Sequence, residues 1–231
     1  MSNDVRAESG SDCFSEQGSP CAIERGRLIV VCAPSGAGKS SLVEMALARI
    51  ERVKFSVSYT TRKPRGAERD GVNYFFVSHE EFRALSERDE FLESAEVHGN
   101  LYGTHRAHVE EMLAAGFDVL LDIDVQGAEQ IRRRTNEAVT IFILPPSRDA
   151  LERRLLLRNL NNREEIERRL HNAAHEVLLW DKFDYLIIND DLDRAYRQLE
   201  AIIIAERCRP GRQAGQVRVV LDTFGGESID A

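Results

Sequence analysis

The chain has 231 residues, 42% of them hydrophobic, with 39 acidic against 31 basic side chains and a formal net charge of −8. This length suits one domain with a single sizeable core, and the apolar runs, such as Ile202 to Ala205, are far too short to cross a bilayer. General nucleic-acid binding depends on a basic surface, so the composition predicts a soluble protein without nucleic-acid or membrane partners.

Residues 1–25 form a leader that is rich in Ser, Gly, Asp and Glu. We expect this leader to be flexible because it has little apolar periodicity, and it lacks the basic-then-apolar pattern of a secretory signal. The cysteines match no metal-ligand spacing; they are Cys13, Cys21, Cys32 and Cys208. We therefore predict free thiols and a cytoplasmic location.

From Arg27 onward, short apolar runs alternate with helical patterns, and four runs are typical of buried parallel strands. These runs are Leu28–Ala33, Val119–Ile123, Thr140–Leu144 and Tyr185–Ile188. Such alternation predicts a doubly wound α/β sheet. Between about Val53 and Thr104 the pattern changes to short polar-alternating runs with turn residues, which indicates an inserted small lobe.

Several helices have recognisable ends. Ser78, followed by Glu81 three residues later, predicts a capping box, and Ser147 is expected to cap another helix. The last regular element is predicted to be the helix Leu192–Arg207, which has one apolar face. Beyond it we expect a tail, in which Val217–Leu221 could add a strand.

A phosphate-binding motif follows the first predicted strand and opens a helix. It reads Ala33-Pro34-Ser35-Gly36-Ala37-Gly38-Lys39-Ser40, with Ser41 next. A bound phosphate needs converging backbone N–H groups, a helix N-terminus, a cation and a hydroxyl for the metal, and this segment supplies all four. Ala33 stands where the usual P-loop has Gly, and a plain glycine turn is the alternative.

Asp122 ends the second apolar run. A P-loop needs an acidic group at the tip of a neighbouring strand to organise magnesium. We therefore predict that Ser40 and Asp122 hold Mg²⁺, directly or through water, the alternative for Asp122 being a polar residue at a sheet edge or helix cap. The loop alone does not distinguish a GTPase, an ATPase and a kinase.

The inserted lobe narrows the choice, because its motifs resemble the nucleoside-monophosphate lobe of guanylate kinases. They are Ser58-Tyr59-Thr60-Thr61-Arg62-Lys63-Pro64-Arg65, Glu68, Gly71, Tyr74-Phe75-Phe76-Val77, Glu93, Gly99-Asn100-Leu101-Tyr102-Gly103-Thr104 and Leu121-Asp122-Ile123-Asp124-Val125-Gln126-Gly127. The resemblance runs from about Leu28 to Arg207. It implies an α/β P-loop kinase that uses Mg²⁺ and ATP to phosphorylate GMP, with dGMP as a further candidate acceptor, in purine nucleotide metabolism.

The resemblance also implies an organisation. A kinase domain at 26–208 would contain a core (26–53, 105–150 and 172–208), a mixed α/β GMP-binding lobe (54–104) and a helical lid (151–171), followed by a tail at 209–231.

The same resemblance places GMP against Ser58, Arg62, Arg65, Tyr74, Glu93, Tyr102, Thr104 and Asp124. A phosphate dianion is suited by the planar guanidinium groups of the two arginines and by the hydroxyl groups of the two tyrosines. Carboxylates suit the N1–H and exocyclic amine of guanine, with Ser58 and Thr104 adding hydroxyls. Taken singly, these residues have simpler explanations: a solvated turn for the arginines, packing for the tyrosines, a helix-surface charge for Glu93 and a helix cap for Thr104.

ATP is assigned to residues 33–41 and to Asn189, for which capping of the next helix is the alternative. The Arg- and Asn-rich stretch 153–169 is helical in pattern and could close over anions. By resemblance the catalytic residues are Lys39, Arg62, Arg154, Arg158 and Arg169. Similar enzymes place Gly on both sides of the central lid arginine, whereas this chain has Leu157-Arg158-Asn159. Ion pairs with Glu164, Glu165 or Glu167 are the alternative for the lid arginines.

Phosphoryl transfer needs alignment and charge neutralisation more than covalent chemistry, so we expect in-line transfer without a dedicated base. Two other classes compete with this interpretation. One is the peptide-binding guanylate-kinase-like module of scaffold proteins, which typically lacks an intact phosphate loop. The other is a P-loop kinase for another acceptor or a GTP hydrolase, against which the paired carboxylates argue. The sequence leaves the oligomeric state open, a homo-oligomer included.

Overall fold

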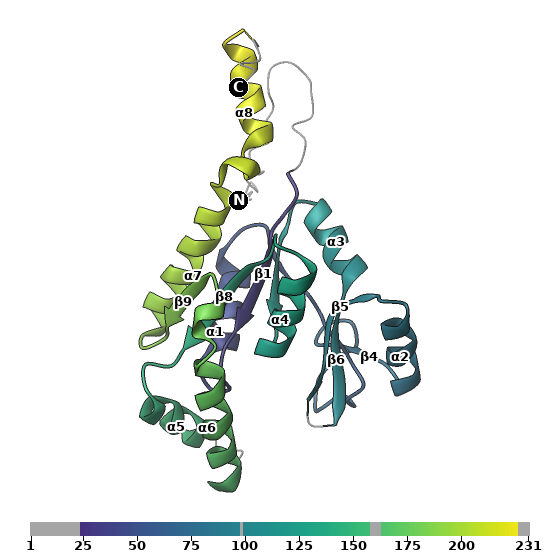
Figure 1. Ribbon diagram of the computed structural model, residues 1–231, viewed down its shortest axis with the longest axis vertical. Coiled ribbons are helices and arrows are strands. Elements are labelled where there is room, and N and C mark those ends of the chain that lie inside the picture. The colour runs from purple at the N-terminus through teal and green to yellow at the C-terminus, as the bar shows by residue number, and fades with distance from the viewer. Residues whose placement is uncertain (1–23, 98, 158–162, 226–231) are drawn as a thin grey trace, which may run out of the picture. The chain divides into compact units, whose positions relative to one another are not determined.

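The computed structural model describes residues 24–97, 99–157 and 163–225 (Figure 1). The chain divides into two compact units, one covering residues 23–213 and the other containing helix α8 (Ala214–Thr223). Within the described part of the chain, no helix is apolar over the length that a bilayer requires.

A parallel sheet forms the centre of the larger unit. Its strands lie in the order β2 (Val53–Phe55), β7 (Asp118–Asp122), β1 (Leu28–Cys32), β8 (Val139–Leu144) and β9 (Tyr185–Ile188). Every neighbouring pair is parallel. All residues of β1 are buried, as expected for a strand with both faces covered. The four predicted strands and the doubly wound α/β class are confirmed.

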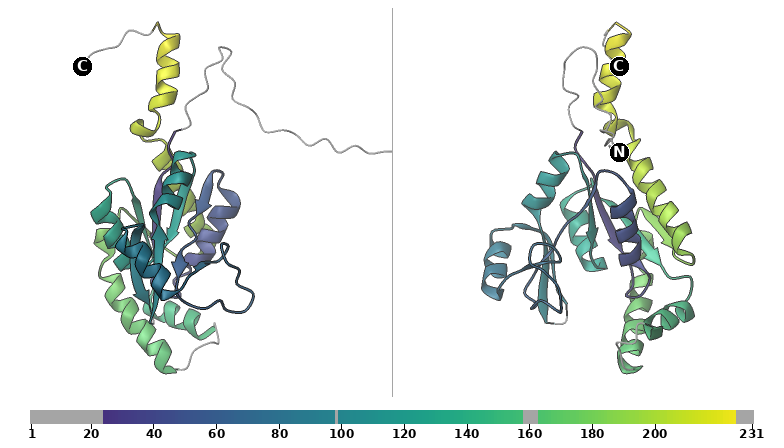
Figure 2. Two further views of the ribbon diagram at one scale, coloured as in Figure 1. Left: turned by 90° about the vertical axis from the view of Figure 1, so that its right-hand side faces the viewer. Right: turned by 180° about the vertical axis from the view of Figure 1, so that it is seen from behind.

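Helices cover both faces of this sheet (Figures 1 and 2). On one face α1 (Lys39–Arg49) and α7 (Leu192–Arg207) pack on one set of strand side chains, including Ile29. On the other, α3 (Arg106–Ala114) and α4 (Val125–Arg134) pack on the alternate set, including Val30. The alternation follows from the period of two along a strand.

A second sheet occupies the predicted lobe. Its order is β4 (Phe75–Phe76), β3 (Tyr59–Thr60), β6 (Asn100–His105) and β5 (Phe91–Val97). Helix α2 (His79–Glu87) begins at the capping box predicted from Ser78 and Glu81, which is confirmed. Phe82 of α2 stacks on Phe91 at 4.5 Å between ring centroids. A Cβ at Gly103 would lie 2.9 Å from the Phe91 ring, so glycine lets the two rings sit on the sheet.

The lid prediction corresponds to helices α5 (Arg148–Leu157) and α6 (Arg163–Val177), which share a small apolar core around Leu155 and Leu170. Ser147 caps α5, because its Oγ accepts a hydrogen bond from the backbone N–H of Ala150 at 3.1 Å. A 3₁₀ turn, η1 (Trp180–Lys182), leads into β9.

The expectation of a strand at Val217–Leu221 is wrong. A 3₁₀ turn, η2 (Pro210–Arg212), is followed by α8, so α7 is not the last regular element. Three valines in this stretch favour a strand by propensity. However, Val217, Leu221 and Phe224 recur at intervals of four and three, which is the helical period. The exact domain boundaries stay predictions.

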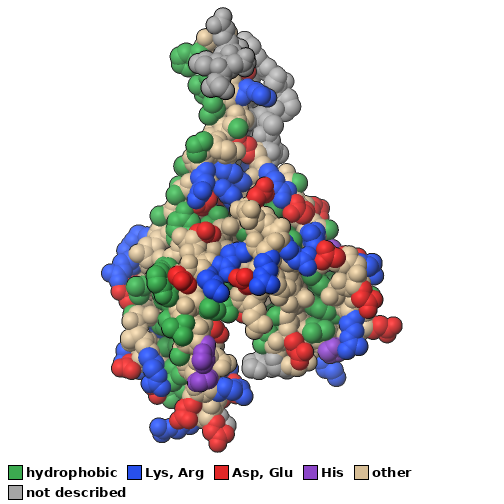
Figure 3. All heavy atoms as spheres, viewed as in Figure 1, with side chains coloured by type: hydrophobic (Ala, Val, Ile, Leu, Met, Phe, Trp, Pro, Cys, Tyr) green, Lys and Arg blue, Asp and Glu red, His purple; other side chains and the backbone are tan. Residues whose placement is uncertain are grey.

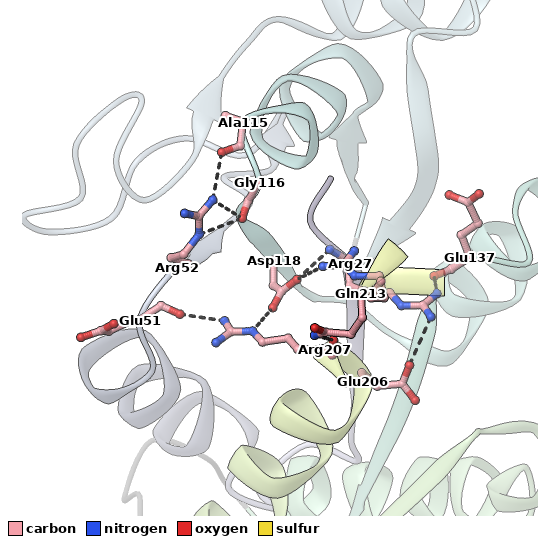
Figure 4. Close-up of polar contacts among 11 residues, drawn as sticks. Arg27, Glu51, Arg52, Ala115, Gly116, Asp118, Glu137, Glu206, Arg207 and Gln213 are labelled. Atoms are coloured by element: carbon pink, nitrogen blue, oxygen red, sulfur yellow. Dashed lines mark hydrogen bonds and ion pairs between the residues drawn. The ribbon is translucent and has the colours of Figure 1, made fainter. Parts of the chain in front are cut away.

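A cluster of buried charges ties the end of α7 to the amino ends of the central strands (Figure 4). Asp118 is only 3% exposed. Its carboxylate accepts hydrogen bonds from the backbone N–H of Arg27 and from Arg207 Nε, each at 2.7 Å. Glu206, also buried, accepts from Tyr185 Oη at 2.6 Å and from Arg209 at 2.7 Å. The cluster fixes the last turn of α7 against β1, β7 and β9.

Replacing Asp118 by Asn should destabilise the protein by about 3 kcal/mol, because partly buried arginines lose their counter-charge. Equilibrium urea unfolding measures this difference. Asp89→Asn is the matched control: Asp89 also pairs with two arginines, but its side chain is 67% exposed, so the change should cost less than about 1 kcal/mol. Equal effects of the two substitutions would contradict the prediction.

Candidate active site

The phosphate-binding motif forms a tight turn between β1 and α1, at the carboxyl edge of the parallel sheet. Gly36 and Gly38 have φ angles of 93° and 99°, values that side-chain-bearing residues rarely adopt. Gly38 is the N-cap of α1, which places Lys39 and Ser40 in its first turn. Ala33, the departure from the usual motif, packs against the apolar core. The predicted strand–loop–helix setting is confirmed.

Asn189 and Arg154, which come from distant segments of the chain, are hydrogen-bonded to this turn. The side-chain amide of Asn189 donates to the carbonyl of Ala37 at 2.7 Å. Arg154 donates to the same carbonyl at 3.2 Å and to the carbonyl of Asn189 at 2.7 Å. A Cβ at Gly38 would lie 2.2 Å from the Asn189 amide nitrogen, so this contact requires glycine.

These contacts decide between the alternatives for Asn189 and for the lid arginines. Asn189 does not cap the following helix, because Asp191 does: its side chain accepts from the backbone N–H of Arg194 at 2.8 Å. Arg154 contacts the loop, whereas Arg169 pairs with Glu165 at 2.9 Å, as the ion-pair alternative expected. Arg158 lies outside the described residues. The contact of Asn189 with adenine and the roles of the lid arginines stay predictions.

Lys39 and Asp122 meet beside the loop. Asp122 is the last residue of β7 and lies opposite Val31 of β1 in the sheet register. The Lys39 ammonium pairs with Asp122 and donates to the carbonyl of Ile123 at 3.1 Å. Sequence reasoning placed these groups together, and the structure brings them together.

The residues present suit a magnesium ion that arrives with a nucleotide. Among the described residues, no group of three or more His, Cys, Asp or Glu side chains is arranged to hold a metal ion. Mg²⁺ typically keeps several waters and takes only one or two protein carboxylates together with phosphate oxygens. The exposed Ser40 and the half-buried Asp122 carboxylate match that donor set.

A cleft of about 300 Å³ opens next to this pair. Figure 3 shows the surface hollowed between α6 and the strands β5 and β6. The lining includes seven residues predicted from the sequence: Lys39, Ser58, Tyr74, Glu93, Tyr102, Asp122 and Asp124. It also includes residues that sequence reasoning missed: Phe55, Asn73, Ala95, Val97 and Ile123. Most of these are apolar and belong to strands or strand ends, which a motif search does not single out.

Glu93 is buried in β5, and none of the described residues places a cation beside it. Its carboxylate accepts a hydrogen bond from the Thr104 hydroxyl at 2.6 Å. Burial, with a smaller contribution from the Asp124 charge, raises the pKa of Glu93 from 4.5 to about 7, although the Thr104 bond opposes the shift. The helix-surface alternative for Glu93 is therefore wrong. The capping alternative for Thr104 is wrong too, because the N-cap of α3 is His105.

Asp124, the second predicted acidic residue, is the N-cap of α4. Its Oδ1 accepts from the backbone N–H of Gly127 at 2.8 Å. The structure thus gives Asp124 a capping role in addition to its place in the lining of the cleft. Glu93 and Asp124 lie close enough for the charge of Asp124 to raise the pKa of Glu93.

Arg62 is buried behind the two tyrosines. Its guanidinium makes a two-pronged pair with Glu68, both N···O distances being 2.9 Å, and lies 5.1 Å from the centroid of the Tyr74 ring. The pair with Glu68 raises the pKa of Arg62 and lowers that of Glu68. Tyr74 and Tyr102 contact each other edge to face at 5.9 Å, so they pack and also line the cleft.

Arg65 differs from Arg62. It is exposed, and its backbone N–H donates to Glu68 at 2.7 Å. The solvated-turn explanation is therefore wrong for Arg62 and fits Arg65. Glu68 bonds to the Arg62 side chain and to the Arg65 backbone and so fixes this turn, a role that the motif alone does not predict.

The site combines a glycine loop and its lysine at a sheet edge, an acidic strand tip beside the lysine, and a cleft lined by two further carboxylates. This combination defines the class of P-loop kinases that act on small nucleotides. A family model described as guanylate kinase matches residues 25–206. Guanylate kinase from Hahella chejuensis is 51% identical over 201 residues, covering 87% of this chain and 96% of the relative. Guanylate kinase from Escherichia coli (strain K12) is 51% identical over 191 residues, covering 82% and 92%.

The solved structures agree with these sequence relatives. The crystal structure of guanylate kinase from Anaplasma phagocytophilum matches with a TM-score of 0.70 and 33% identity, covering 90% of this chain and all of that one. The chain therefore belongs to the guanylate kinase family.

The buried Glu93 predicts how stability depends on pH. A carboxyl group whose pKa is raised on folding binds more protons in the folded state, so the free energy of unfolding should fall as pH rises from 4.5 to about 7 and then level off. Glu93→Gln should reduce this slope and make the free protein more stable at about pH 8, by an amount on the order of 3 kcal/mol.

Urea unfolding across this pH range measures the effect. Glu96→Gln, at an exposed position of the same strand, is the matched control and should follow the wild-type curve. A wild-type curve that rises between these pH values, or one that Glu93→Gln leaves unchanged, would contradict the assignment.

Proposed function

We propose that this chain transfers the terminal phosphoryl group of ATP to GMP, giving ADP and GDP, with magnesium assisting an in-line transfer. Membership of the guanylate kinase family carries the activity and makes ATP the donor. The structural observation that supports it most is the single cleft that has Lys39 and Asp122 at one part of its lining and Glu93 and Asp124 at another.

The acidic pair suits guanine as the acceptor base. Guanine presents its N1–H and exocyclic amine as donors along one edge, and a carboxylate accepts from both kinds of group. Adenine has no hydrogen at N1. The wrong base would leave the remaining acceptor positions of the buried Glu93 carboxylate without donors, and such unpaired positions discriminate by orders of magnitude. Thr104, already bonded to Glu93, and Ser58 add hydroxyls at the base.

The phosphate of GMP is assigned to Arg62, Arg65, Tyr74 and Tyr102. Arg62 is held by Glu68 next to the ring of Tyr74, which lines the cleft, so its guanidinium is fixed in place before a phosphate arrives. The exposed Arg65 reaches the anion from the solvent side. dGMP remains a further predicted acceptor.

The loop residues 33–41 hold the phosphates of ATP through backbone N–H groups and the N-terminus of α1. Lys39 neutralises charge on the transferred phosphoryl group, and the neighbouring lid contributes Arg154, Arg158 and Arg169. Magnesium held by Ser40 and Asp122 would supply further charge neutralisation on the phosphate oxygens. The residues of this chain align donor and acceptor, and none is assigned as a base.

A coupled assay of ADP formation tests the proposal directly. We expect rapid turnover with ATP, Mg²⁺ and GMP, and slower turnover with AMP or UMP by at least about 100-fold. Chelation of the metal should abolish turnover. Equal rates with GMP and AMP would overturn the base assignment, and no turnover with any monophosphate would favour the peptide-binding module instead. The cytoplasmic location stays a prediction, and the assay does not address the oligomeric state.

Substitutions should separate the two halves of the site. Lys39→Ala should lower kcat by about 100- to 1000-fold with little change in the KM for GMP, because it removes a charge that acts on the moving phosphoryl group. Arg62→Ala should chiefly raise the KM for GMP, by about tenfold or more, because it removes a charged donor to the acceptor phosphate.

Arg83→Ala, at an exposed arginine of α2 in the same lobe, is the matched control and should behave as wild type. Steady-state kinetics at saturating ATP give both constants. Wild-type kinetics for Lys39→Ala and Arg62→Ala would remove the site model.

A further inference from the structure

Helix α4 contacts the edge of the lobe sheet at the residue next to Glu93. β5 is the last strand of that sheet, paired only with β6 in the described structure. Ser94 therefore has a backbone N–H and a backbone C=O on its outer side. The N–H donates to Gln130 Oε1 at 3.0 Å, and the C=O accepts from Gln130 Nε2 at 2.8 Å. One side-chain amide thus satisfies both groups, as a neighbouring strand would.

A second contact between α4 and β5 lies one turn earlier. Gly127 is buried, and a Cβ at this position would lie 2.8 Å from Glu93 Oε2 and 3.2 Å from the Ile123 side chain. Its φ angle is not the reason for glycine, because the residue is inside a helix. The reason is space: the absence of a side chain lets the Glu93 carboxylate lie directly against the helix.

The same helix begins at Asp124. Helix α4, which has about three turns, therefore contacts both acidic residues. Asp124 is its N-cap, the Glu93 carboxylate lies against Gly127, and Gln130 is hydrogen-bonded to the strand that carries Glu93. The separation of the two carboxylates is fixed by these contacts and not by the strand pairing of either sheet, because Asp124 follows the central sheet and Glu93 belongs to the lobe sheet.

We propose that Gln130 is a positioning residue for substrate selection: with Gly127, it clamps β5 to α4 so that Glu93 and Asp124 stay at the spacing of the two donors on guanine. The proposal deepens the proposed function and, for its kinetic test, rests on it. Misplacement of a recognition group by about 1 Å is enough to lower a rate 100-fold.

Gln130→Met keeps the length of the side chain and removes both hydrogen bonds. We expect kcat/KM for GMP to fall by roughly ten- to a hundredfold. The fall should be smaller for IMP, which keeps the N1–H but lacks the exocyclic amine. The GMP-to-IMP preference should therefore shrink by about tenfold, while the KM for ATP stays unchanged. Gly127→Ala should shrink the same preference by displacing Glu93.

Glu129→Gln is the matched control. Glu129 is adjacent on α4 and pairs with Arg132 and Arg133 at the surface, so its removal should leave both kcat/KM values as in wild type. Equal losses for GMP and IMP in Gln130→Met would show a merely structural role and overturn the proposal, as would unchanged preference in Gln130→Met and Gly127→Ala.

A measurement on the free protein separates this inference from the proposed function. Side-chain carboxyl NMR of ¹³C-labelled protein follows the titration of Glu93, which should move toward its ordinary range in Gln130→Met because the released strand admits water. If wild type fails to phosphorylate GMP, the proposed function is wrong and this titration alone decides the clamp. An unchanged Glu93 titration would overturn it.

Discussion

The parallel register of β1 against β7 is the constraint on which the site depends, because it sets Val31 opposite Asp122. The phosphate loop leaves the sheet from β1, and Asp122 leaves it from β7, so Lys39 meets Asp122 only in this register. Two residues further on, Asp124 starts α4, and α4 in turn grips β5 beside Glu93. A slip of one residue would turn Asp122 to the other face of the sheet and would separate both halves of the cleft.

The charges of the site differ in how they are compensated before any nucleotide binds. Lys39 is paired with Asp122, and Arg62 is paired with Glu68, so two of the cations assigned to phosphate already have carboxylate partners. Glu93 is bonded to Thr104 and has no cation beside it among the described residues, and its raised pKa reflects its burial. Binding of a phosphate therefore exchanges one anion for another around these two cations. Binding of a base must instead supply the donors that Glu93 lacks, which makes the base half of the cleft the more selective one.

Local patterns were sufficient for the fold and for much of the site. Apolar runs gave the four core strands, Ser78 with Glu81 gave a capping box, and the glycines gave the loop, because each depends on residues close in sequence. The missed contacts join distant residues: Asn189 to Ala37 is 152 residues apart, and Gln130 to Ser94 is 36. No spacing rule encodes such pairs. Helix α8 was missed because local propensity was misleading there: its valines favour a strand when they are considered by propensity alone.

The lid arginines are not equivalent, and their contacts explain why. Arg154 donates to two backbone carbonyls under the loop, while Leu155 of the same helix would lie 2.9 Å from a Cβ at Gly36. Helix α5 is therefore part of the wall of the phosphate loop, and Arg154 supports the loop together with the Asn189 amide, which donates to the same Ala37 carbonyl. Arg169 is held by one partly exposed pair with Glu165 on its own helix. Exposed pairs of that kind contribute less than about 1 kcal/mol, so a phosphate oxygen can replace Glu165 at little cost. In this structure Arg154 therefore supports the phosphate loop, whereas Arg169 is the lid arginine whose partner is exchanged more easily.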